Sequence, residues 1–195
     1  MTTDRLEAFS DGVVAILITI MVLEFKAPHS AEITALEPLI PTALSYVLSF
    51  LYLGIYWNNH HQLMHAADHV SGGVLWANLH LMFWLSVTPF VTAWMGETTF
   101  ASGPVAAYGF VLTMNAIAYT ILTATLIRAN GPDSAVAKGL GKDVKGRISI
   151  VLYILGVVLA GVQHYVSCAL YAVVALIWLV PDKRFVPHLE EKICD

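Results

Sequence analysis

Residues 5–23 read RLEAFSDGVVAILITIMVL, a charged cluster that leads at once into a long apolar run. The charged residues Arg5, Glu7 and Asp11 therefore lie in or beside a segment that is apolar enough to enter a membrane. Charged side chains are costly near hydrocarbon, and a helix that keeps them normally uses them to pack against other helices or to line a pathway. We expect this segment to decide how the chain folds and what it does.

The composition of the whole chain agrees with a membrane location. Of its 195 residues, 57% are apolar and only 12% are charged, whereas soluble domains carry about 25% charged residues. The mean hydropathy is +0.70. The two cysteines, Cys168 and Cys194, form neither a disulfide framework nor a metal-binding pattern. These properties predict an all-α, multi-pass membrane protein with one domain over residues 1–195.

The apolar segments are long enough to define transmembrane helices, each of which needs about 20 residues. The stretch 148–180 is too long for one crossing, and Gly161–His164 offers the best turn residues within it. The polar connection 129–147 is expected to be a flexible cytoplasmic loop and not a second domain. We predict six spans, at about 5–25, 36–64, 70–95, 103–128, 147–162 and 164–180.

Positive charges divide very unevenly between the two sides of this topology. One side holds only Lys26, and the other holds nine basic residues: Arg5, Arg128, Lys138, Lys142, Lys145, Arg147, Lys183, Arg184 and Lys192. Because basic residues accumulate in cytoplasmic segments, both termini are predicted to be cytoplasmic.

A stripe of apolar side chains follows the helical period along the first span. Ile16, Ile20 and Leu23 share one face, Phe9 lies seven residues before Ile16, and Thr19 borders the stripe. Several copies around an axis would form rings of branched side chains that close a pore by dewetting. The same stripe would also serve as ordinary helix–helix packing, and periodicity leaves both interpretations open.

Asp11 lies about 140° around the helix from Ile16, at 100° per residue, so it is expected to point between helices. Its predicted role is structural, in a hydrogen-bonded junction with other polar side chains at the same depth. Ser10 and polar groups on the second and third spans are its candidate partners, and these groups include Trp57, His60, His61, Asn78 and His80.

Other functions remain possible on the residues alone. His61 and His65 are four residues apart, a spacing that can hold haem or a metal on one helix face, but no HExxH motif or cysteine pair accompanies them. Asp11 with the histidines could act as the proton relay of a proton-coupled secondary transporter. Hydrolytic and phosphate-binding motifs are absent from the sequence, and so is a TVGYG filter. We expect no enzyme activity, no cofactor, no metal site and no nucleic-acid partner.

The pattern Arg5-x-x-x-Phe9-Ser10-Asp11 resembles the signature of the endosomal–lysosomal potassium channel family, in particular its single-repeat bacterial members. The polar end of the second span, from Trp57 to His61, and the pattern Asn78…Pro89-Phe90 in the third are also similar to that family.

This resemblance implies a potassium-selective cation channel in a bacterial plasma membrane. It implies a homotetramer of six-helix subunits, in which the first helices line a central pore without a re-entrant filter. By position after the motif, Ile16 would form the narrowest ring, Ile20 and Leu23 further apolar rings, and Thr19 the hydroxyl ring linked to potassium preference. The motif residues would form a hydrogen-bonded network between helices, whose predicted members are Arg5, Phe9, Ser10, Asp11, Trp57, His60, His61, Asn78 and His80. Potassium would be the permeant ligand, and the partners would be other copies of the chain and the lipid bilayer.

Overall fold

A computed structural model describes residues 2–141 and 143–179, and every regular element in them is a helix. The elements are α1 (Thr3–Val22), the 3₁₀ helix η1 (Ile33–Leu39), α2 (Ile40–His65), α3 (Gly72–Glu97), α4 (Ser102–Asn130), α5 (Ala135–Leu140) and α6 (Val144–Leu179). The C-terminal basic residues Lys183, Arg184 and Lys192, together with Lys142, lie outside the described residues.

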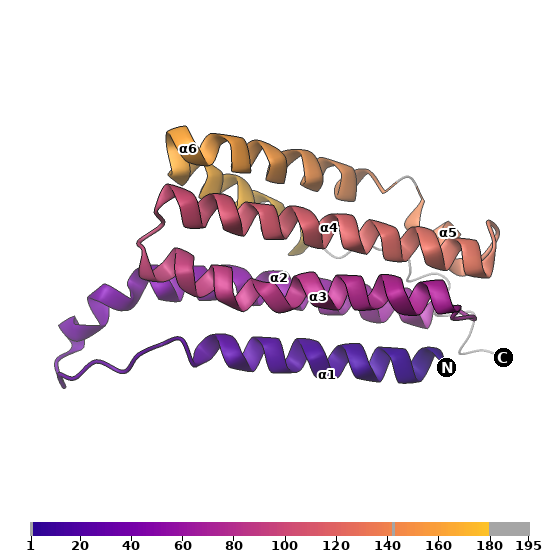
Figure 1. Cartoon of the computed structure of the whole chain (residues 1–195), viewed down its shortest axis with the longest axis horizontal. Coiled ribbons are helices and arrows are strands. Elements are labelled where there is room, and N and C mark those ends of the chain that lie inside the picture. Colours follow the sequence, from indigo (N-terminus) through magenta and orange to yellow (C-terminus); the bar gives the residue numbers. More distant parts are fainter. Residues whose placement is uncertain (1, 142, 180–195) are drawn as a thin grey trace.

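Successive long helices run antiparallel, as Figure 1 shows. The start of α1, the α2–α3 connection and α5 lie at one end of the bundle, on the right of Figure 1. The segment that joins α1 to α2 and the α3–α4 connection lie at the other end. This arrangement brings the motif of α1 to the same end as the last turns of α2 and the first turns of α3.

Four of the described helical segments are long and apolar enough to cross a membrane: Ile33–His65, Gly72–Glu97, Ser102–Asn130 and Val144–Leu179. The chain is therefore an all-α, multi-pass membrane protein. The 20-residue α1 falls outside this set because its N-terminal half carries Asp4, Arg5, Glu7 and Asp11.

The last helix is broken near its middle. A straight helix of 36 residues would be about 54 Å long, well beyond the roughly 30 Å of a hydrocarbon core. Gln163 has non-helical backbone angles (φ −146°, ψ 76°), and the chain folds back there. This break lies within Gly161–His164, the segment where the length of the apolar run and its turn residues predicted that the chain folds back.

The connection between α4 and α6 is more ordered than the expected flexible loop. It contains α5, which begins at an N-cap formed by Ser134, whose hydroxyl accepts from the backbone N–H of Ala137 at 3.3 Å. Val136 of α5 is fully buried in the same apolar cluster as Leu126 and Val74. A single apolar side chain thus ties this polar segment to the ends of α3 and α4.

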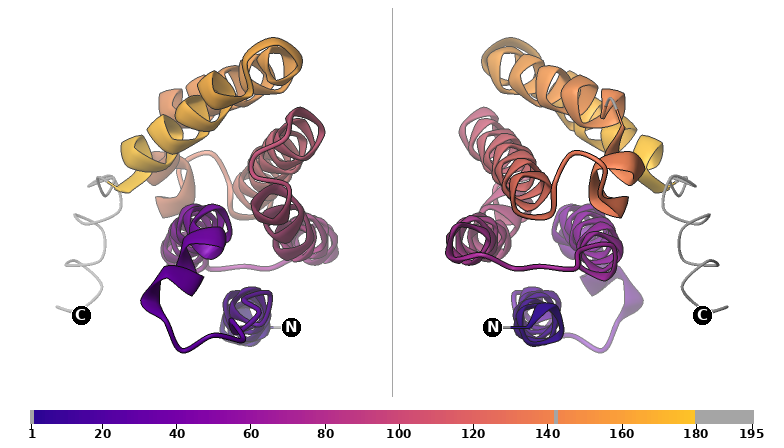
Figure 2. Two further views of the ribbon diagram at one scale, coloured as in Figure 1. Left: turned by 90° about the vertical axis from the view of Figure 1, so that its left-hand side faces the viewer. Right: turned by 90° about the vertical axis from the view of Figure 1, so that its right-hand side faces the viewer.

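The bundle is layered from α1 to α6, as the end-on views in Figure 2 show. α1 packs on α2 and α3, α4 packs between α3 and α6, and the two halves of α6 form the opposite edge. Buried hydroxyl groups join the central helices, since Ser49 Oγ lies 2.7 Å from Thr92 Oγ1 and 2.9 Å from Tyr108 Oη. Such pairing is required where no water is present to satisfy polar groups.

Tyr171 fixes the second half of α6 against its neighbours. Its ring lies against Gly109 of α4 and Gly156 of the first half of α6, where a Cβ atom would overlap it. Its backbone carbonyl accepts from Tyr52 Oη at 2.6 Å. The two glycines therefore create the space that lets a fully buried tyrosine hold three helical segments together.

Replacement of Gly109 by alanine is expected to destabilise the subunit. The added methyl group collides with Tyr171, and overpacking of this kind costs about 1–3 kcal/mol. Thermal unfolding of the purified protein in detergent should show a lower melting temperature for Gly109→Ala. Gly103→Ala is the control on the same helix, because a Cβ there meets nothing within 4 Å. Equal melting temperatures for the two variants would contradict this account of Tyr171.

Candidate functional site

α1 has one face buried against the subunit and one face exposed. The buried residues, Leu6, Ser10, Val14, Leu17 and Met21, recur every three or four positions and contact α2 and α3. The opposite face is exposed and carries Ile16 (57% exposed), Ile20 (41%) and Leu23 (76%), together with Phe9. The predicted apolar stripe is thus the part of α1 that its own subunit leaves uncovered.

Thr19 lies on this exposed side of α1, and its hydroxyl is oriented by the backbone. Thr19 Oγ1 donates to the carbonyl oxygen of Ile16 at 2.8 Å. A threonine hydroxyl has one hydrogen and two acceptor lone pairs, so this bond uses the hydrogen and leaves the lone pairs available. The exposed group is therefore an oxygen acceptor, which is the kind of ligand that an alkali cation requires.

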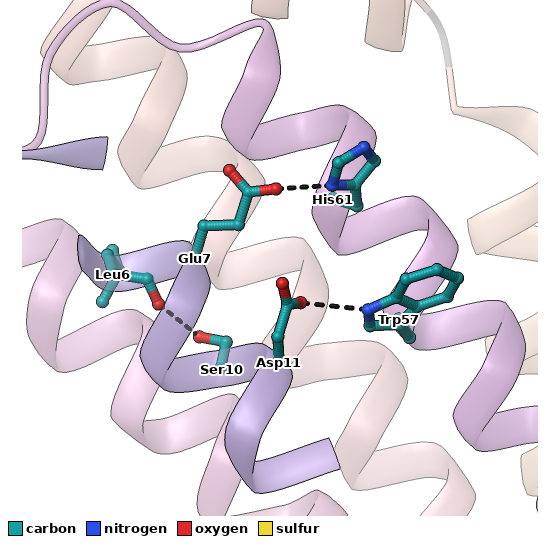
Figure 3. Close-up of polar contacts among 6 residues, drawn as sticks. All are labelled: Leu6, Glu7, Ser10, Asp11, Trp57 and His61. Atoms are coloured by element: carbon teal, nitrogen blue, oxygen red, sulfur yellow. Dashed lines mark hydrogen bonds and ion pairs between the residues drawn. The ribbon is translucent and has the colours of Figure 1, made fainter. Parts of the chain in front are cut away.

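Two polar contacts tie α1 to α2, and Figure 3 shows both. Trp57 Nε1 donates to Asp11 Oδ1 at 3.0 Å, and His61 Nδ1 lies 2.5 Å from Glu7 Oε1. The two acids are four residues apart on α1 and their partners are four residues apart on α2. Because the helices are antiparallel, this matched spacing places both pairs on one shared edge, one turn apart.

A second, buried chain of hydrogen bonds joins α1 to α3 and then to α2. Ser10 Oγ donates to the Leu6 carbonyl at 2.9 Å and accepts from Asn78 Nδ2 at 2.9 Å. His60 Nε2 donates to Asn78 Oδ1 at 2.8 Å. Ser10, Asn78 and His60 are at most 3% exposed. Asn78 therefore links three helices in a place that water does not reach.

Three predicted members of the network take other positions. Arg5 is exposed and makes no hydrogen bond or ion pair with another described residue. His80 accepts from Trp84 Nε1 at 3.0 Å, one turn along α3, and has no hydrogen bond to α1 among the described residues. Phe9 belongs to the exposed face of α1. The contacts of the motif thus come from Ser10 and Asp11, and not from every residue of its pattern.

Glu7 also contributes to this network, although it is not among the residues that the sequence predicted for it. It lies between the motif positions, and its carboxylate contacts Nδ1 of His61. The signal was present in the sequence, because Glu7 and Asp11 repeat at the same four-residue interval as Trp57 and His61. Only the antiparallel register of α1 and α2 turns these two intervals into two pairs.

The described part of the chain has no group of three or more His, Cys, Asp or Glu side chains positioned to hold a metal ion. His61 and His65 lie edge to face, with ring centroids 5.0 Å apart. The Nδ1 atom of His61 already faces Glu7. This geometry fits a polar contact between helices better than a pair of metal ligands.

Loss of Asn78 should destabilise the junction of α1 with the bundle. Asn78→Ala leaves Ser10 and His60 without their buried partner, which costs about 1–3 kcal/mol. The melting temperature in detergent should fall, whereas Asn58→Ala, a matched change at an exposed position of α2, should leave it unchanged. Identical unfolding of both variants would mean that the buried bonds contribute nothing to stability.

The chain is similar to known proteins in both sequence and fold. Residues 5–89 match the family described as "Endosomal/lysosomal potassium channel TMEM175". The chain is 51% identical over 191 residues to "Potassium channel HX13_20290" from Chryseobacterium sp., with 98% of this chain and all of that protein covered. It is 34% identical over 126 residues to "Potassium channel B446_29190" from Streptomyces collinus, with 60% of this chain and 61% of that protein covered.

A solved structure has the same architecture. The crystal structure of a lysosomal potassium-selective channel TMEM175 homolog from Chamaesiphon minutus superimposes with a TM-score of 0.82 at 26% identity, and covers 92% of this chain and 97% of that one. Similarity over nearly the whole length, in sequence and in fold, identifies this chain as a bacterial member of the TMEM175 family.

Proposed function

We propose that this chain forms a potassium-selective cation channel in a bacterial plasma membrane. The observation that carries the proposal is the exposed face of α1. It is an apolar stripe bordered by a hydroxyl group, on a helix that polar contacts hold in place. The relatives named as potassium channels support the ion and the type of transport. A channel conducts passively, so no catalytic step is assigned to any residue.

The proposed subunit crosses the membrane six times, through α1, α2, α3, α4 and the two halves of α6. Both termini are proposed to be cytoplasmic. The described basic residues Arg128, Lys138, Lys145 and Arg147 all belong to the end of the bundle that contains α5. At the opposite end, Lys26 lies 3.0 Å from Glu97. The excess of positive charge at one end supports this orientation.

The proposed channel is a homotetramer in which four α1 helices surround the pore. α1 lies at the edge of its subunit, and its inner face is already covered by α2 and α3. Small residues on the exposed face, such as Gly12 and Ala15, would let neighbouring helices approach closely. With α1 at the axis, α4 and α6 lie at the periphery, where their exposed apolar side chains meet lipid.

Ile16 is proposed as the main barrier to ions. Four copies would form a ring without a polar ligand, so a hydrated potassium ion could pass only after the ring widens and fills with water. Ile20 and Leu23 would add two further apolar rings at one-turn intervals. Opening would then require a change in the separation or rotation of the α1 helices.

Thr19 is proposed as the source of ion preference. Its hydrogen is bonded to the Ile16 carbonyl, so four oxygen atoms with available lone pairs would face the ion next to the barrier. Such a ring replaces only part of an ion's hydration shell. Potassium loses its water more easily than sodium does, and a partial replacement of this kind therefore favours potassium.

Ile16→Asn is expected to produce a leaky and less selective pore. An amide in the ring keeps the constriction hydrated and so removes the barrier to ions that dewetting creates. Potassium and sodium flux into liposomes that contain the purified protein should both rise, and their ratio should fall. Val22→Asn is the control, since Val22 is exposed on α1 but lies about 120° around the helix from Ile16.

Unchanged flux in Ile16→Asn would count against Ile16 as the gate. Flux that saturates and follows an imposed proton gradient would instead favour a proton-coupled transporter, the alternative function.

The proposed assembly gives a direct expectation for particle mass. Native mass spectrometry in detergent should detect four chains of 21.3 kDa each in one particle. Asp11→Ala should reduce the tetramer fraction, because Asp11 accepts from Trp57 and thereby sets the orientation of α1. A stable monomer of the unaltered chain would rule out a pore built from several α1 helices.

A further inference from the structure

A groove opens between α4, α5 and the first half of α6, at the end of the bundle that contains α5. Its volume is about 200 Å³, and it is open to its surroundings. Its walls include Thr120, Ala124 and Ile127 of α4, Leu140 of α5, and Arg147 and Ile150 of α6. We call it the α4–α6 groove. It lies on the opposite side of the subunit from α1, so the proposed pore does not use it.

The groove changes from polar to apolar along its length. Arg147 is in the first turn of α6, and Ile150 is one turn further along. Thr120 lies ten residues before the end of α4 at Asn130, which corresponds to about 15 Å along the helix. The groove therefore runs from the level of the helix ends into the depth of the hydrocarbon. A ligand that fits it has a polar group at one end and a hydrocarbon chain at the other.

The polar end presents a positive charge. Arg147 is exposed and makes no side-chain hydrogen bond or ion pair with another described residue. Asp143 also lines the groove, but one of its carboxylate oxygens accepts from the backbone N–H of Gly146 at 3.3 Å and caps the N-terminus of α6. The partial positive charge of that helix end offsets the carboxylate. Lys145 points elsewhere, with its ammonium 5.8 Å from the centroid of the Trp178 ring.

The deep end offers apolar contact and no unused donor. Thr120 Oγ1 donates to the carbonyl of Ala116 at 2.9 Å, so its hydrogen is already bonded. Exposed apolar residues continue beside the groove on α6, including Ile148 and Val151. These neighbours form a surface that suits acyl chains. A soluble anion would gain no favourable interaction in this part of the groove.

We propose that the α4–α6 groove binds an anionic phospholipid of the adjacent leaflet. Its phosphate group is held by the Arg147 guanidinium, whose planar donors match phosphate oxygens, and one acyl chain lies along Ala124, Ile127 and Ile150. The proposal goes beyond ion conduction and depends only on the membrane location of the chain. It can be tested without any measurement of flux.

The test is native mass spectrometry of the purified protein in detergent with equal amounts of phosphatidylglycerol and phosphatidylcholine. The unaltered protein should retain phosphatidylglycerol preferentially. Arg147→Gln should reduce that preference roughly fivefold, the change expected for one basic residue at a membrane surface. Arg128→Gln is the matched control, because Arg128 is exposed in the last turn of α4 but does not line the groove.

A second pair of variants tests the groove without a change in charge. Ala124→Phe fills the apolar wall and should reduce retention of phosphatidylglycerol, whereas Ile121→Phe, at an exposed position outside the groove, should not. Excess inorganic phosphate should displace nothing if a lipid is the ligand. Melting temperatures equal to that of the unaltered protein show that each variant is folded.

Three results would overturn the proposal. If Arg128→Gln and Arg147→Gln reduced the preference for phosphatidylglycerol equally, the lipid would be attracted by the overall positive charge of the surface and not by the groove. Unaltered retention in both Arg147→Gln and Ala124→Phe would exclude the groove as the site. Displacement by inorganic phosphate would indicate a soluble anion. A channel that fails to conduct potassium but binds phosphatidylglycerol in this pattern would refute the proposed function and leave this inference intact.

Discussion

The rotation of α1 about its own axis is set by polar bonds, and the rest of the functional arrangement depends on it. α1 carries apolar side chains on both its buried and its exposed faces. Because lipid tails are as apolar as leucine, the hydrophobic effect does not determine which face packs against the subunit. The bonds of Asp11 with Trp57 and of Ser10 with Asn78 make that choice. They leave Ile16 and Thr19 on the uncovered side of α1.

The fold was largely predictable because the thickness of the bilayer limits the length of each apolar segment. An apolar run must be about 20 residues long to cross a bilayer, so an excess of length in 148–180 already required a turn. α5 was less predictable. Its helix has only six residues, and one buried side chain, Val136, decides that the segment is ordered. Periodicity cannot detect an element that short.

The sequence predicts the depth in the membrane at which the polar side chains of the candidate site lie. It does not predict which of them form hydrogen bonds with one another. The helix ends that carry these side chains lie on the same side of the membrane. Asp11, Trp57, His61 and Asn78 therefore lie at a similar depth, whatever the rotation of each helix about its axis. Which groups then meet depends on rotation and register. His80 illustrates this limit, since its ring is satisfied by Trp84 on its own helix and not by α1. Glu7 illustrates the converse, because its partner became evident only from the antiparallel register of α1 and α2.

The bond from the Thr19 hydroxyl to the Ile16 carbonyl also has a consequence for the sign of the charge that can pass. A hydroxyl that is able to rotate can offer either its oxygen to a cation or its hydrogen to an anion. With the hydrogen committed to the backbone, the proposed ring offers only oxygen atoms. A chloride ion would lose water there and find no donor to replace it, so the same bond that prepares the ring for potassium makes it repel anions.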